Sequence, residues 1–207
     1  MVALGVVALV GWALGLRALT ELFAGSSSLK ANTALCFVAL GTAVVLRGTE
    51  RQRIRTVLEV AAAVVAVTTT VEHAKGVSAG IDQLLFPDPF DPADAVGRMS
   101  LGSSIALALT ALGLLGLDSL RRSVRVAAQV PLLLAGGIGL VGLVGYASGL
   151  NRLYWQSDVT TMAIPTAAGI SLLVTGALVL APLEGVIAVV MRRSPGGRLL
   201  RLSLIHI

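Results

Sequence analysis

Long apolar runs separated by short polar segments make up most of this chain. Six runs stand out, at residues 2–16, 31–46, 56–74, 101–117, 126–147 and 163–181. Most approach the roughly 20 residues that a helix needs to cross the hydrocarbon core of a bilayer. The pattern predicts an all-α integral membrane bundle of six transmembrane helices. Pro131 and the Gly136–Gly137 pair should interrupt the fifth helix, because proline removes a backbone hydrogen bond.

Composition agrees with this interpretation. Of the 207 residues, 56% are hydrophobic and 13% are charged, whereas soluble domains have about 45–50% apolar and about 25% charged residues. The formal net charge is +5, but the basic residues lie in short loops beside apolar runs. We therefore expect the lipid bilayer as a partner, and no nucleic acid. The single cysteine, Cys36, lies within a predicted span, so it belongs to no disulfide framework and should be a buried packing residue.

The distribution of basic residues predicts the orientation. Segments 47–55, 118–125 and 192–201 hold four, three and four of the 16 lysines and arginines, and the alternate segments hold the other five. Cytoplasmic loops carry the excess of Lys and Arg. We therefore expect a multi-pass membrane protein, with both termini in the cytoplasm and loop 75–99 facing outward.

Three segments resemble one another where even-numbered helices begin. They are LKANTALCFVALG from Leu29, MSLGSSIALALTA from Met99 and MAIPTAAGISLLV from Met162. Each has an apolar first residue, then a turn-forming residue, a hydroxyl residue and a small residue. The odd-numbered helices end in GWALG, EHAKG and GYASG, which share a ring residue, an alanine and a glycine. This spacing predicts a helical hairpin that is used three times.

The repeat register brings six candidate ligand-sensing residues to one depth near the outer surface: the rings of Trp12, His73 and Tyr146 and the hydroxyls of Thr33, Ser103 and Thr166. If the hairpins share an axis, these side chains would converge on a shallow outward-facing cleft for a small polar or amphipathic ligand. In the alternative interpretation, the rings are interfacial anchors and the hydroxyls cap helices.

Two ionisable positions are further candidates. Glu72 lies beside His73 and Lys75, and a histidine next to a carboxylate can titrate near neutral pH; the alternative is a local ion pair at the interface. Glu59 lies inside a predicted span, where ionisable residues are functional candidates by default. The alternative for Glu59 is a structural pair with Arg55, one helical turn earlier.

Motifs for catalysis or cofactor binding are missing from the sequence. It has no phosphate-binding glycine loop, no nucleophile-elbow motif and no metal-ligand spacing. We expect no catalytic residue, no metal and no cofactor in this chain.

NTALCF, GIDQLLF followed by GRMS, and PTA…LLVTGALVLA followed by SPGGRLLR together resemble the multi-helix N-terminal membrane region of certain bacterial sensor proteins. In that family the region precedes cytoplasmic PAS, histidine-kinase or diguanylate-cyclase domains. The second repeat departs from the family, because it has Gly102-Ser103-Ser104 where an NTA-like triplet is usual. The resemblance implies a sensory input module in the bacterial inner membrane, open to a small ligand from the periplasmic side. Such a module relays a stimulus to a C-terminal output domain, which we expect to be a histidine kinase, in a homodimer formed through the cytoplasmic region.

The predicted organisation is a membrane module at 1–185, a cytoplasmic juxtamembrane linker at 186–201 and a tail at 202–207. The tail, LSLIHI, is what a sequencing-adapter end would encode, so we expect an artefact there and a natural chain that continues after Arg201. Two alternatives to sensing remain open at this point. A small transporter or channel would also use repeats, and a membrane scaffold would need no ligand.

Overall fold

The computed structural model describes residues 1–21, 27–87, 97–148, 162–181, 184, 185 and 188. All regular secondary structure in these residues is helical, which confirms the all-α prediction. The predicted linker, apart from Ala188, and the predicted artefact at 202–207 lie outside the described residues. The helices are α1 (Val2–Leu14), α2 (Arg17–Thr20), α3 (Ala31–Val45), α4 (Gln52–Lys75), α5 (Leu101–Leu117), α6 (Arg122–Ala127), α7 (Gln129–Ala147) and α9 (Ile164–Val179).

The predicted runs match the observed helices closely. The largest differences are at α4 and α6, which begin before the predicted starts at 56 and 126. The first turns of α4 carry Arg53 and Arg55, and an apolar pattern does not register charged helical residues. The fifth run is divided at Ala128, as Pro131 predicts, because its ring clashes with the carbonyl four residues earlier. The Gly136–Gly137 pair leaves α7 continuous.

Helix length separates two groups of apolar helices. Helix α4, with 24 residues, and the α6–α7 segment, with 26, are long and apolar enough to cross a membrane. Helices α1, α3, α5 and α9 are apolar but have 13 to 17 residues. Membrane association therefore has weak support from two helices, and a bundle of six spans stays a prediction.

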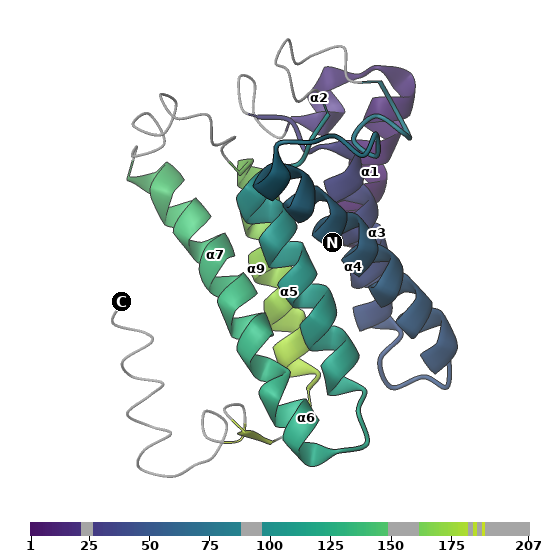
Figure 1. Ribbon diagram of the computed structural model, residues 1–207, viewed down its shortest axis with the longest axis vertical. Coiled ribbons are helices and arrows are strands. Elements are labelled where there is room, and N and C mark those ends of the chain that lie inside the picture. The colour runs from purple at the N-terminus through teal and green to yellow at the C-terminus, as the bar shows by residue number, and fades with distance from the viewer. Residues whose placement is uncertain (22–26, 88–96, 149–161, 182–183, 186–187, 189–207) are drawn as a thin grey trace.

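Three helical hairpins organise the bundle (Figure 1). Helix α1 packs on α3, α4 packs on α5, and α7 packs on α9. The second helices of the hairpins, α3, α5 and α9, also contact one another, so they form the centre of the bundle. Helix α4 additionally packs on α3, and α7 on α5, so these first helices cover the joints between neighbouring hairpins.

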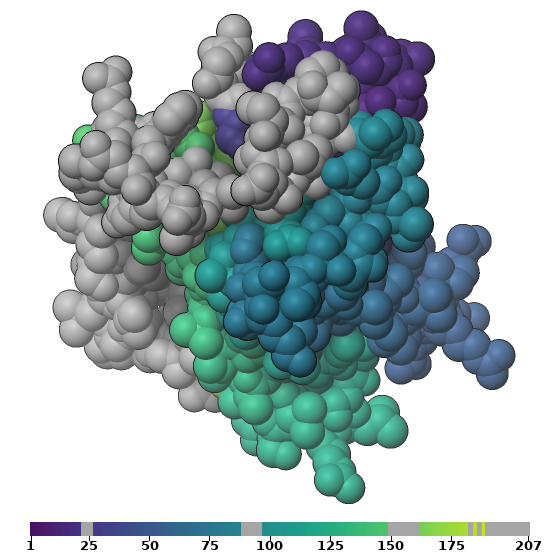
Figure 2. All heavy atoms as spheres, turned by 45° about the horizontal axis from the view of Figure 1, so that its top comes forward, coloured from purple at the N-terminus to yellow at the C-terminus, as the bar shows by residue number. Residues whose placement is uncertain are grey.

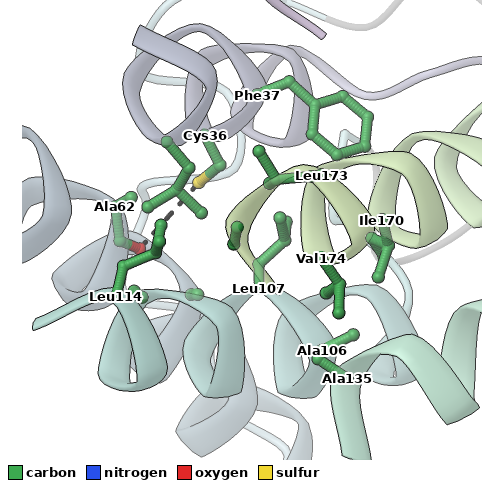
Figure 3. Close-up of a cluster of buried hydrophobic side chains, with 14 of the residues drawn as sticks. Cys36, Phe37, Ala62, Ala106, Leu107, Leu114, Ala135, Ile170, Leu173 and Val174 are labelled. Atoms are coloured by element: carbon green, nitrogen blue, oxygen red, sulfur yellow. Dashed lines mark hydrogen bonds between the residues drawn. The ribbon is translucent and has the colours of Figure 1, made fainter. Parts of the chain in front are cut away.

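Leucines and small residues fill the centre, together with one aromatic ring. Figure 3 shows Leu107 and Leu114 of α5 close to the side chains that α3 and α9 contribute. The ring of Phe37 lies against Gly169, where an added Cβ would come within 2.5 Å of the ring. Close helix contact of this kind needs glycine or alanine at the crossing point.

The polarity of α4 is the reverse of a helix in a soluble protein. Its exposed face carries a stripe of valines at helical spacing: Val57, Val60, Val64, Val67 and Val71. Its buried face carries Arg55, Glu59, Ala62, Ala66, Thr69 and Glu72. In Figure 2 the start of the helix, coloured steel blue, projects from the body of the molecule. Helix α4 therefore presents apolar side chains outward and ionisable ones to its neighbours.

Candidate functional site

The ring residues of the three hairpins make the same hydrogen bond. The indole Nε1 of Trp12 donates to the carbonyl of Leu29 at 2.8 Å, and the Tyr146 hydroxyl donates to the carbonyl of Met162 at 2.8 Å. His73 Nε2 lies 2.9 Å from the carbonyl of Met99. A carbonyl only accepts, so this nitrogen carries a proton. Each ring thus ties the end of one helix to the start of the next.

The starts of the second helices also share their geometry. The residue before each of these helices has the same extended backbone. Lys30 before α3 has φ −64° and ψ 148°, Ser100 before α5 has φ −63° and ψ 152°, and Ala163 before α9 has φ −63° and ψ 145°. Of these three, Ser100 has a capping side chain, and it accepts from the Ser103 amide at 3.2 Å. The predicted hydroxyls, Thr33, Ser103 and Thr166, follow at the third position of each helix and are buried.

The helix crossings repeat in the same register. An added Cβ at Gly5 would lie 2.6 Å from the Ala34 carbonyl, and one at Gly139 would lie 3.0 Å from the Ala167 carbonyl. Both glycines precede their hairpin's ring residue by seven positions, and in the second hairpin that place is taken by Ala66, which is fully buried. The three hairpins therefore share hydrogen bonds, backbone angles and crossing positions in the register that the sequence predicted.

An ionic network lies at the ring end of α4, and we call it the outer network. Arg98 Nε lies 2.8 Å from Asp82 Oδ2 and 4.0 Å from Glu72 Oε2, and Arg98 Nη2 donates to the Val77 carbonyl at 3.2 Å. The Glu72 carboxylate also accepts from the Ala79 amide. Nearby, Asn32 of α3 donates to the Ile81 carbonyl at 3.0 Å. The loop after α4 is therefore fastened to both α3 and α4.

A second network lies at the other end of α4, and we call it the inner network. Asp118, which follows α5, lies 3.2 Å from Arg47 and 3.2 Å from Arg55. Arg47 also donates to the Leu114 carbonyl at 2.7 Å and lies 3.8 Å from Glu59. Burial lowers the pKa of Arg47, while Asp118 and Glu59 act in the opposite direction. The Arg47 side chain therefore crosslinks the loop before α4 to the end of α5.

The structure shows which charges meet. Arg55, the alternative partner considered for Glu59, forms its ion pair with Asp118. Glu72 pairs with Arg98, and Lys75 is exposed. Both true partners come from loops, where sequence spacing carries no signal about which charges meet. Isolated charges beside apolar runs, such as Arg98 and Asp118, were the available clue.

A third polar joint holds the segment that follows α9. Arg125 of α6 donates to both carboxylate oxygens of Glu184, at 3.1 and 2.7 Å, and these bonds lower the pKa of Glu184. Gln129 of α7 donates to the Glu184 backbone carbonyl at 2.8 Å. Glu184, which follows α9 in the chain, is therefore fixed to the α6–α7 segment.

The residues that the structure describes contain no group of three or more His, Cys, Asp and Glu side chains able to hold a metal ion. The predicted ring and hydroxyl residues lie at equivalent places within their hairpins, and their role in ligand sensing stays a prediction. Comparison with known proteins finds no matching family model, no matching curated protein and no matching solved structure.

Proposed function

We propose that this chain is a membrane-embedded sensory input module of a bacterial signal-transduction protein, with six spans and both ends of the bundle's chain on the cytoplasmic side. The reversed polarity of the bundle supports the membrane location. Large apolar side chains cover the outside of α7 as well as α4, with Val141 73% and Val144 62% exposed. In water such surfaces would be costly, whereas lipid solvates them.

The observation that carries the signalling proposal is the placement of buried carboxylates at both ends of α4. Glu59 and Glu72 are 0% and 1% exposed, and they lie about 20 Å apart along the axis at 1.5 Å per residue. An arginine from a loop lies next to each carboxylate: Arg47 next to Glu59 and Arg98 next to Glu72. A ligand or proton that alters the outer network would therefore change the position that α4 prefers, and the inner network would report that change on the opposite side of the bundle.

The Arg125–Glu184 joint supplies the last link of the proposed relay. It fixes the chain after α9 to α6, and α7, which follows α6, packs on both α5 and α9. Movement of the second hairpin is therefore transmitted to the exit from the bundle. A cytoplasmic output domain, such as a histidine kinase acting as a homodimer, would receive the signal there, in line with the family resemblance of the sequence.

The proposal is tested with a chimera in which residues 1–201 precede a diguanylate-cyclase domain, and cyclic dinucleotide is measured in cells. Arg98→Lys, which keeps the positive charge but not the guanidinium geometry, should change the output at unchanged abundance, whereas Lys75→Gln, at an exposed position of the same helix end, should leave it unchanged. Equal output from both variants and the parent would count against sensing. Ion or solute flux through vesicles that contain the purified chain would favour a transporter instead.

The membrane topology has its own test. A reporter fused after Arg122 should behave as cytoplasmic, and one fused after Asp91 should behave as periplasmic. The opposite pattern, or recovery of the chain in the soluble fraction, would contradict the proposed orientation or membrane location.

A further inference from the structure

We propose that Glu59 is a reversible proton-binding site at the inner end of the bundle. This inference goes beyond sensing of an outer ligand and holds whether or not the chain signals. It rests on the burial of this carboxylate, on its hydrogen bonds and on the charges around it.

Glu59 differs from the buried carboxylates of Glu72 and Asp82 in its lack of hydrogen bonds within the described part of the chain. Its side chain is 0% exposed, and neither carboxylate oxygen has a hydrogen-bond partner among the described residues. Glu72, by contrast, accepts from the Ala79 amide, and Asp82 accepts from Arg98. A buried carboxylate without hydrogen bonds is far more costly when charged than when protonated.

The neighbouring charges oppose this cost without cancelling it. Arg47, from the loop before α4, lies 3.8 Å from Glu59, beyond hydrogen-bond distance. Both Arg47 and Arg55 lie closer to Asp118, at 3.2 Å. Asp118 is therefore the main counter-ion of both arginines, and it also repels a charge on Glu59. Burial and Asp118 favour the protonated form, and the arginines favour the ionised form.

The helices packed on α4 add one titratable group. Helices α3 and α5 carry no charged residue between Ala31 and Val45 or between Leu101 and Leu117. Cys36 of α3 contacts α4 through its Sγ, which lies 3.9 Å from the Ala62 carbonyl and is bonded to no charged group. Arg47, Arg55 and Asp118 are therefore the charges that act on the protonation equilibrium of Glu59, together with its burial.

The network offers a route for the proton and a consequence of its arrival. The Asp118 and Arg55 side chains are 13% and 10% exposed, so the network reaches solvent. With Glu59 ionised, the two arginines and two carboxylates sum to zero charge. Protonation leaves a net charge of +1 and removes one of the attractions on Arg47. Among the described residues, Arg47 then contacts Asp118 and the Leu114 carbonyl.

The test is infrared difference spectroscopy of the purified full chain between about pH 5 and 9, the range that buried carboxyl groups can reach. The protein should show the carbonyl band of a protonated carboxyl group that disappears as the pH rises. Glu59→Gln should abolish the band, and Glu50→Gln, at an exposed position before α4, should retain it. Persistence of the band in Glu59→Gln, or its absence from the parent protein, overturns the proposal.

Asp118→Asn provides a second test that keeps Glu59 in place. Removing the competing carboxylate releases both arginines to Glu59, so its proton affinity should fall by about tenfold and the band should titrate at lower pH. An unchanged or higher midpoint overturns the assignment even if Glu59→Gln fails to fold.

Discussion

The contact between Phe37 and Gly169 gives the sharpest test of the bundle centre. An alanine at residue 169 would place its Cβ 2.5 Å from Cζ, 2.7 Å from Cε2 and 3.2 Å from Cε1 of the ring. Phe37 is fully buried, so the ring has no solvent into which it can rotate. Gly169→Ala should therefore push α3 and α9 apart.

The expected magnitude follows from two opposing terms. Replacing a helical glycine by alanine adds about 1 kcal/mol of helix propensity, and overpacking a well-filled core costs about 1–3 kcal/mol. Gly137→Ala is the matched control, because Gly137 is also helical and an added Cβ there meets nothing within 4 Å. Gly169→Ala should be less stable than Gly137→Ala by the clash alone, about 1–3 kcal/mol.

The assay is thermal unfolding in detergent micelles. A chain of this length shifts by roughly 2–4 °C per kcal/mol, so the two variants should differ by about 2–12 °C. In a Phe37→Leu background the difference should shrink, because the shorter side chain leaves the ring position. Equal melting temperatures for the two glycine variants would refute the packing of Phe37 on Gly169.

Three further predictions follow from the polar contacts. Trp12→Phe leaves the buried Leu29 carbonyl without its donor and should cost about 1–3 kcal/mol of unfolding free energy in a denaturant titration; no loss would contradict the ring-to-carbonyl bond. Arg98→Gln removes the counter-ion of two buried carboxylates and should cost about 3–5 kcal/mol of unfolding free energy in the same titration. Arg125 lowers the pKa of Glu184 in the folded protein. Their bond therefore stabilises the fold above the ordinary pKa of a glutamate, and this stabilisation is lost as the pH falls through the lowered pKa. The melting temperatures of Glu184→Gln and the parent protein should differ at neutral pH and converge in acid.

The helices and the repeat could be predicted because both depend on local information. Apolar runs defined the helices, and Pro131 marked the break before α7. The ring-Ala-x-Gly endings placed Trp12, His73 and Tyr146 in register before any contact was known. Each of the three sequence matches is weak by itself, but their consistent spacing predicted that the hairpins share one structure.

The ionic networks could not be predicted, because their partners are distant in sequence. Arg47 and Leu114 are 67 residues apart, and Arg125 and Glu184 are 59 apart. The nearest opposite charge on the same helix, Arg55, was the natural partner for Glu59, but Asp118 competes for it from the end of α5. Such competition is decided by the packing of α4 on α5, which sequence spacing does not contain.

Equivalent positions in the three hairpins can be compared, which separates the residues that all hairpins share from those that the second hairpin alone carries. In the register set by the rings, Glu72 takes the place of Gly11 and Gly145, and Glu59 takes the place of Leu132, a leucine that is also fully buried. The third hairpin therefore folds with an apolar side chain where the second has a carboxylate. Buried charge adds little to stability compared with a well-packed apolar residue. The third hairpin thus folds without carboxylates at these two places, which agrees with the roles proposed above for Glu59 and Glu72 in proton binding and signalling.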